Sequence, residues 1–86
     1  MDTKFTKINL RCLGAEFAKY RKISGIRQED AAKAVGKTRG WLSQVEIGAL
    51  NISLVDALHL CDLYKCDIRR VIDDAEKTTK ELKGMR

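Results

Sequence analysis

Proline is absent from the 86 residues of the chain, and aromatic residues make up only 6% of them. Because proline breaks the interior of a helix, its absence is typical of a chain made mostly of helices. No segment alternates apolar and polar residues over the length of a strand, so the sequence gives no support for a sheet. We therefore expect an all-α fold.

Long hydrophobic runs are also missing. The apolar segments are only a few residues long, whereas a membrane-spanning helix needs about 20 such residues. The opening segment, MDTKFTKINL, lacks the apolar core of a signal peptide. We therefore expect no membrane span and a cytoplasmic location.

The few cysteines and the one histidine give no sign of a metal site. Cys12, Cys61 and Cys66 are an odd number without the spacing of a disulfide framework, and in a cytosolic protein they are most simply reduced, small hydrophobic residues. His59 lies near two of them in sequence, but these are fewer than four good ligands, and their spacing is unlike any zinc finger. The sequence predicts neither a metal nor another cofactor.

Motifs for catalysis are absent as well. The sequence contains no nucleophile–base pair, no phosphate-binding loop and no carboxylate pair with a plausible pocket. We therefore do not expect an enzyme.

The chain has enough apolar material for one core, and a surplus of positive charge. Hydrophobic residues make up 44% of it, which suffices for one compact domain but not for two. The net charge of +5 is compatible with a polyanionic partner but supports nucleic-acid binding only modestly. We expect a flexible arm over residues 1–8, one domain over residues 9–79 and a basic tail over residues 80–86.

Apolar residues recur at helical spacing in five segments, each with a start or stop signal. The expected helices cover about Leu10–Ser24, Gln28–Val35, Arg39–Ile47, Leu54–Lys65 and Ile68–Thr79. Their expected N-caps include Asn9, Thr38, Ser53 and Asp67, and glycines at positions 25, 36 and 48 follow the first three helices. In the fourth helix the expected buried side consists of Leu54, Leu58 and Cys61, joined by Val55 and Leu60.

Residues 27–48 predict a helix, a tight turn and a second helix. The signals that a helix-turn-helix requires occur in the right order. They are the small Ala32 in mid-helix, the turn glycine Gly36, the N-cap Thr38 and the inward-facing Leu42 and Val45. The second helix is left with a polar outer face, which is the feature that indicates a function.

Four pieces of the chain resemble the phage-repressor-like (Cro/cI, Xre-type) helix-turn-helix regulators. They are LGAEFAKYR, RQEDAAKAVG, TRGWLSQVEIG, and NISL followed by an apolar helix and YKCDI, covering about Leu13 to Ile68. The resemblance implies a five-helix, lambda-repressor-like domain that dimerises on double-stranded DNA at palindromic operators, in the cytoplasm of a bacterium or from a phage or plasmid gene. Residues 36–48, with the aromatic Trp41, are similar more weakly to the controller proteins of restriction systems.

The same resemblance places the base-reading residues at Arg39, Gly40 and Gln44, with Ser43 beside them. Arg39 can donate two hydrogen bonds to a guanine, or it can bind phosphate instead. Gln44 can pair with an adenine in the same bidentate way. Gly40 has no side chain to read with, so either the backbone approaches DNA closely or a flanking residue does the reading.

A second set of residues is expected at the DNA phosphates. These are Arg27, Gln28, Lys37, Thr38, Trp41 and Asn51. Lys37 occupies a position where the family usually buries a small apolar residue, so its ammonium must reach outward. For Trp41 there are two interpretations of equal weight: an indole contact to the phosphate wall, or packing against the second helix or the loop at Ile47.

The family also suggests an ion pair between Arg21 in the first helix and Glu46 at the end of the third. Such a pair ties the two helices together and has an architectural role. The alternative is that Glu46 is merely exposed.

The fifth helix is the expected dimer interface. Its apolar stripe, together with a residue of the fourth helix, comprises Tyr64, Ile68, Val71, Ile72 and Ala75. The alternative is that the stripe closes the core, and both can hold. A rival function also remains open, in which the fold binds a protein such as a toxin or a larger regulator. The apolar segment 47–50 favours that reading, whereas Arg39, Gln44 and the basic charge favour DNA.

Overall fold

The computed structural model describes residues 8–84 of the chain. Most of the expected N-terminal arm, residues 1–7, and the last two residues lie outside this range. Within it the chain forms five helices and no strand, as predicted. The helices are α1 (Leu10–Ile23), α2 (Gln28–Ala34), α3 (Arg39–Glu46), α4 (Leu54–Tyr64) and α5 (Ile68–Gly84). No helix in residues 8–84 is long and apolar enough to cross a membrane.

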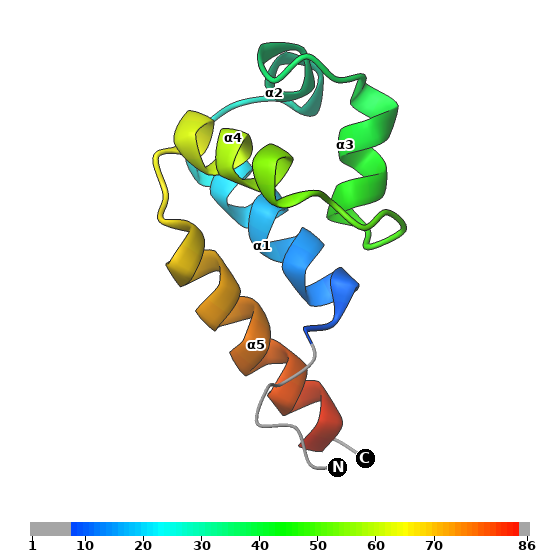
Figure 1. Cartoon of the computed structure of the whole chain (residues 1–86), viewed down its shortest axis with the longest axis vertical. Coiled ribbons are helices and arrows are strands. Elements are labelled where there is room, and N and C mark those ends of the chain that lie inside the picture. Colours follow the sequence, from blue (N-terminus) through cyan, green and yellow to red (C-terminus); the bar gives the residue numbers. More distant parts are fainter. Residues whose placement is uncertain (1–7, 85–86) are drawn as a thin grey trace.

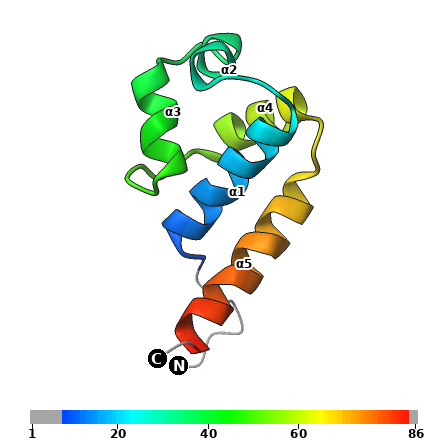
Figure 2. The same cartoon turned by 180° about the vertical axis from the view of Figure 1, so that it is seen from behind.

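The helices form an elongated body in which α1 is central. α5 lies alongside α1 and runs in the opposite direction, while α2 and α3 sit together at the far end (Figures 1 and 2). α4 crosses α1, in front of it in Figure 1 and behind it in Figure 2. The pair α2 and α3 is therefore carried at one end of the molecule, with α5 reaching toward the other.

Side-chain caps start the helices where the sequence predicts them. The Asn9 carboxamide oxygen accepts from the Arg11 amide at 2.8 Å, and the Ser53 hydroxyl accepts from the Asp56 amide at 3.1 Å. The Asp67 carboxylate likewise accepts from the Arg69 amide at 2.8 Å. Each of these bonds satisfies an amide that the first turn of a helix leaves without a partner. The predicted N-caps of α1, α4 and α5 are therefore confirmed.

One large side chain from each of four helices fills the centre of the core. Phe17, Leu42, Leu60 and Val71 come from α1, α3, α4 and α5, and none of them is exposed to solvent. The short helix α2 adds only alanines, which let it lie close to its neighbours. A helix this short and weakly apolar depends on the other four for its stability.

The buried side of α4 differs from the prediction. Leu54, Val55 and Leu58 are 65%, 60% and 44% exposed. Leu60 and Cys61 are buried as predicted, and the inward face is completed by Ala57 and Tyr64. Because α4 carries apolar residues on nearly every side, their spacing does not define one face, and the rest of the fold decides which side is buried.

Gly14 allows α1 to lie directly on the end of α3, a contact that the sequence did not predict. A Cβ atom at this position would lie 2.7 Å from the carbonyl oxygen of Glu46, and closer still to that of Val45. Gly48 makes a similar approach from the other side, because a Cβ there would lie 2.6 Å from the Arg11 amide nitrogen. The position of α3 is thus fixed by backbone packing against the first turns of α1.

α5 is longer than predicted. The expected end was Thr79, with a basic tail after it, but residues 80–84 continue the helix to Gly84. Thr79 is buried, and its hydroxyl accepts a hydrogen bond of 3.0 Å from the Asn9 amide while it donates to the Ala75 carbonyl. This anchor holds the helix against the start of α1, and the following Lys80, Glu81 and Leu82 are good helix formers.

Candidate DNA-binding face

The two helices α2 and α3 are joined by the tight turn that the sequence predicts. Gly36 adopts a φ of 74°, in the left-handed region that glycine occupies without strain. Thr38 then caps α3, because its hydroxyl accepts from the Trp41 amide at 3.1 Å. Ala32, Leu42 and Val45 are all buried, which leaves the opposite side of α3 facing solvent.

A buried carboxylate ties the end of α3 to α1. Glu46 accepts from Arg21 through both of its oxygens, at 2.7 Å and 3.2 Å, and the two side chains are only 6% and 11% exposed. The hydrogen bond with Glu46 raises the pKa of the Arg21 guanidinium, so that side chain stays charged. Arg21 also donates to the Ile26 carbonyl at 2.8 Å, which fixes the chain just before α2.

Gln28 joins the same carboxylate. Its amide nitrogen donates to a Glu46 oxygen at 2.8 Å, so the first residue of α2 is held by the last residue of α3. The resemblance placed Gln28 at a DNA phosphate but did not predict this bond. Because one of its two amide N–H groups is engaged here, only the other remains free for a phosphate.

The outer face of α3 carries the four residues expected to read bases. Arg39, Gly40 and Gln44 are exposed and Ser43 is half-buried. Within residues 8–84, neither the guanidinium of Arg39 nor the carboxamide of Gln44 has a hydrogen-bond or ion-pair partner. Two multi-donor side chains are therefore presented to solvent from the first and second turns of a helix whose position is fixed.

A shallow depression connects this face to the start of α2. It encloses about 400 Å³ and is lined by Arg21, Arg27, Gln28, Glu29 and Arg39. The Arg27 side chain is 82% exposed and touches only Asp30, at 3.0 Å. The structure thus brings two expected phosphate-contacting residues, Arg27 and Gln28, next to Arg39 around one largely basic hollow. Such a hollow suits a phosphate group.

Lys37 lies close to both an acidic residue of α4 and the ring of Trp41. The Lys37 ammonium lies 3.4 Å from an Asp56 carboxylate oxygen and 5.3 Å from the centroid of the Trp41 ring. The Trp41 ring is half-buried and packs against the core. The structure therefore shows the Trp41 ring packed against the core with Lys37 over it, while an indole contact to phosphate stays a prediction.

In the segment after α3, some apolar side chains pack against the core and others are exposed to solvent. Leu50 and Ile52 pack against the core, whereas Ile47 is 64% exposed. Asn51 is exposed too, and within the described residues its side chain has no hydrogen-bond partner. Asn51 thus lies in the loop between α3 and α4 with its amide free to bind.

The expected dimer stripe on α5 is largely internal. Val71 and Ala75 are fully buried and Tyr64 is 4% exposed, so these three residues close the chain's own core and cannot form an outer surface. Ile68 is half-buried and Ile72 is 36% exposed. The exposed apolar surface lies instead over the start of α4 and reaches Ile72, around a groove of about 230 Å³. Residues on this groove include Leu13, Ile52, Leu54, Ile68 and Ile72.

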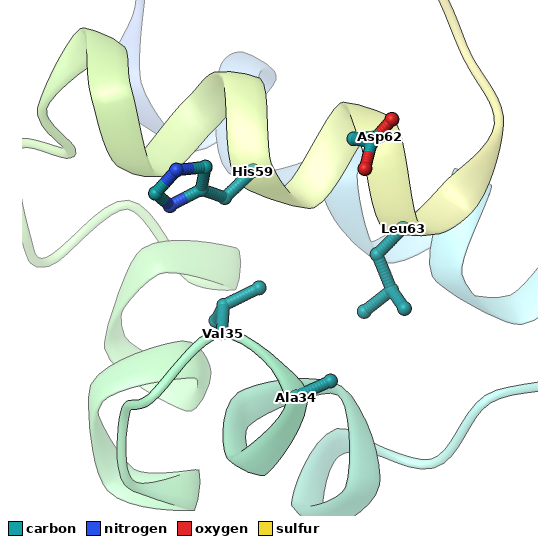
Figure 3. A pocket seen from close by; sticks show the side chains of 5 residues that line it. All are labelled: Ala34, Val35, His59, Asp62 and Leu63. Atoms are coloured by element: carbon teal, nitrogen blue, oxygen red, sulfur yellow. The ribbon is translucent and has the colours of Figure 1, made fainter.

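A second hollow of about 350 Å³ separates the end of α2 from α4. Figure 3 shows His59 and Leu63 extending from α4 toward Ala34 and Val35. Among residues 8–84 there is no group of three or more His, Cys, Asp or Glu side chains that could hold a metal ion. Cys61 is buried on the inner side of the same helix, and this burial raises the pKa of its thiol to about 12.

Comparisons with known proteins agree with this geometry. A family model described as a helix-turn-helix domain matches residues 13–72. The clp gene regulator ClgR from Corynebacterium glutamicum superposes with a TM-score of 0.84 at 20% identity, covering 93% of this chain and 85% of that one. Another crystal structure of ClgR gives a TM-score of 0.77 at 22% identity, covering 84% of this chain and 94% of that one.

A third solved structure is more similar in sequence. The restriction-modification controller protein C.AhdI from Aeromonas hydrophila gives a TM-score of 0.69 at 30% identity, covering 73% of this chain and 91% of that one. No curated protein sequence matches the chain. Together with the family match, these likenesses confirm the resemblance read from the sequence. The chain belongs to the helix-turn-helix family of DNA-binding regulators and has the phage-repressor-like, five-helix fold.

Proposed function

We propose that the chain is a sequence-specific transcriptional regulator that inserts α3 into the major groove of double-stranded DNA. One observation carries this proposal: Arg39 and Gln44 are free of internal partners on the outer face of a helix that the buried Glu46 network holds in place. Rigid placement matters because bidentate contacts to base edges tolerate little misalignment. Arg39 would pair with a guanine and Gln44 with an adenine, with Ser43 beside them.

The phosphate contacts would come from residues before and after this helix in the chain. Arg27 and the remaining N–H group of Gln28 border the basic hollow next to Arg39. Thr38, which caps the start of α3, and Asn51, in the loop after α3, are exposed as well. Lys37 would have to leave Asp56 in order to bind phosphate, and Trp41 would contribute only the exposed edge of its ring. Phosphate contacts of this kind fix register and do not read sequence.

We also propose that the regulator acts as a homodimer on a palindromic operator. A single domain reads few base pairs, and two copies about one helical turn apart read twice as many. The apolar surface of Leu54, Val55, Leu58 and Ile72 is the candidate interface, because it lies on α4 and α5 and leaves the outer face of α3 free. A two-fold contact would pair this surface with itself and cover both apolar grooves.

Binding to an operator that overlaps a promoter would block transcription without any further component. Repression, including repression of the regulator's own gene, is therefore the mode of action that we propose. This mode requires no cofactor and places the protein in the cytoplasm with its DNA.

Selection from a random duplex pool, followed by a salt titration, tests the proposal. The chain should enrich a palindromic site, and the logarithm of its binding constant should fall linearly with the logarithm of salt concentration. Gln44→Ala should relax the preference at one base pair per half-site while leaving nonspecific affinity nearly unchanged. Arg27→Ala should instead weaken binding on all sequences. Absence of binding at low salt would refute the proposal.

A second candidate function is supported by the exposed apolar surface on α4 and by Ile47. In that case the fold would bind a different protein through this surface, as an antitoxin or co-regulator does, and would bind DNA only weakly. Light scattering of the purified chain distinguishes the two. A dimer whose formation depends on the α4 surface favours the operator-binding homodimer, whereas a monomer that selects no duplex favours the interaction module.

A further inference from the structure

Gly40 lies on the outer face of α3, and neither its backbone conformation nor a neighbour among residues 8–84 requires a glycine at this position. Its φ is not positive, unlike those of Gly25, Gly36 and Gly48, so its backbone is open to any residue. A Cβ atom added at Gly40 would approach only the Thr38 hydroxyl, at 3.9 Å, which is ordinary van der Waals contact. Glycine is also, after proline, the least favourable residue within a helix.

The other glycines with close neighbours show what an internal requirement looks like. At Gly14 an added Cβ would meet the backbone of α3, and at Gly48 it would meet the backbone of α1. Nothing comparable surrounds Gly40. The described residues therefore impose no requirement for glycine at this position, and any advantage of glycine there would arise against a molecule outside the chain.

The residues around Gly40 define the surface of α3 that a bound molecule would contact. Arg39 precedes it and Ser43 and Gln44 follow one turn later, so a bare patch of helix backbone lies between side chains that can reach base edges. This gap offers no side-chain donor or acceptor. In the major groove the one methyl group on a base pair is the C5-methyl of thymine, because cytosine carries only a hydrogen at C5 and the other groups that are read there are donors or acceptors.

We propose that Gly40 is a specificity-determining residue, an inference that rests on the proposed function. The space left by its missing side chain receives the C5-methyl group of a thymine. The missing side chain lets the first turn of α3 sit closer to that base pair than any other residue would allow. Arg39 and Gln44 then read the base pairs on either side. Thymine is selected there by shape, with no hydrogen bond from residue 40.

This role makes Gly40→Ala unusual in its two effects. The added methyl fills open space on the free protein and improves helix propensity, so the melting temperature should stay the same or rise. On the DNA the same methyl occupies the place of the thymine methyl, so the operator affinity should fall about tenfold, the factor that corresponds to 1.4 kcal/mol. If Gly40 had no role at the DNA, the variant would show the same melting behaviour but no loss of operator affinity.

A double-mutant cycle gives the decisive test. It combines Gly40→Ala, which adds a methyl group to the protein, with replacement of thymine by deoxyuridine, which removes one from the DNA. The duplex is selected by the wild-type chain from a random pool, and each thymine in a half-site is then replaced singly by deoxyuridine, which lacks only the C5-methyl. At one position per half-site, deoxyuridine should weaken the wild type a few-fold and restore most of the affinity lost by Gly40→Ala. The coupling between the two methyl groups is the difference between the affinity change of the double replacement and the sum of the two single changes.

Gly84→Ala is the matched control. Gly84 is also helical and has nothing near an added Cβ, but it lies at the end of α5, away from α3. This variant should bind the selected duplex as the wild type does. If the wild type selects no duplex, the proposed function fails and this inference with it. If the wild type selects a duplex but Gly40→Ala binds it equally well, or shows no coupling to any thymine methyl, the inference alone is overturned.

Discussion

Gln28 donates a hydrogen bond of 2.8 Å to a Glu46 oxygen, and so the first residue of α2 is joined to the last residue of α3. Arg21 binds the same carboxylate from α1. One nearly buried side chain therefore joins α1 to α2 and α3, the two helices of the proposed DNA-binding face. Glu46 therefore stabilises the fold and also holds the proposed DNA-binding helix in position.

Replacing Glu46 by alanine should destabilise the protein strongly. The change leaves the Arg21 guanidinium buried without its carboxylate, which typically costs about 3–5 kcal/mol. Urea unfolding followed by circular dichroism measures the loss. Glu29→Ala is the control, because Glu29 is exposed on α2, and it should stay within about 0.5 kcal/mol of the wild type. A loss below about 1 kcal/mol for Glu46→Ala would contradict a structural role for the pair.

Gly14→Ala should destabilise the fold by about 1–3 kcal/mol or more, because an added methyl would press on the backbone at the end of α3. This backbone can move only if α1 and α3 separate. The midpoint of thermal unfolding measures the effect, and Gly84→Ala, where no atom is near, should leave it nearly unchanged. An unchanged midpoint for Gly14→Ala would mean that the two helices are farther apart than the structure shows.

Much of the fold could be predicted because its signals are local. A cap and a turn glycine each act within one turn of helix, so Asn9, Thr38, Gly36 and Ser53 could be placed from the sequence alone. The ion pair of Arg21 with Glu46 was expected only through the family resemblance. Nothing in its spacing of 25 residues would have revealed it.

The features that were missed depend on contacts between distant parts of the chain. The anchor of α5 is a hydrogen bond between Asn9 and Thr79, which are 70 residues apart. The close packing at Gly14 depends on where α3 lies, and the exposed side of α4 depends on which of its apolar faces the core accepts. In the candidate site, the Gln28 bond to Glu46 was missed for the same reason. The exposure of Arg39 and Gln44 could be predicted from the helical period, whereas their role at base edges came from the family resemblance and stays a prediction.

Tyr64→Phe should be neutral or slightly stabilising. The Tyr64 hydroxyl is buried, and within the described residues it has no hydrogen-bond partner. Burial also raises the pKa of this phenol above its ordinary value. Removing an unpaired buried hydroxyl removes a desolvation cost without breaking a bond. The control is Tyr20→Phe, which loses a hydrogen bond to Asp74 of 3.4 Å and should cost up to about 1 kcal/mol. Urea unfolding compares them, and a larger loss for Tyr64→Phe would refute the prediction.

Stability should fall in alkaline solution, beginning near the ordinary thiol pKa of 9.0 and continuing toward about 12, the value to which burial raises the pKa of Cys61. Above the lower value the unfolded chain releases the Cys61 proton while the folded chain retains it, so rising pH favours unfolding. The raised pKa values of Cys66 and Tyr64 act in the same direction. The free energy of unfolding measured against pH should therefore be level below about pH 8 and then decline.

Cys61→Ala separates the contribution of this thiol. The variant should be less stable at neutral pH because it leaves a small cavity, but its stability should fall less than that of the wild type between about pH 8 and pH 10. Identical slopes for the two proteins would show that Cys61 does not retain its proton in the folded state.

Leu58→Glu should abolish the proposed homodimer without harming the monomer. Leu58 is 44% exposed in the free chain, so a carboxylate there remains solvated, but in a two-fold interface it would be buried near its own copy. Sedimentation equilibrium should show a monomer, and circular dichroism should show an unchanged helix content. Operator affinity should fall because each half-site then binds one domain alone. Ile23→Glu is the control, since Ile23 is 72% exposed at the end of α1 and does not belong to the candidate interface on α4 and α5. A Leu58→Glu protein that still dimerises would place the interface elsewhere on the molecule.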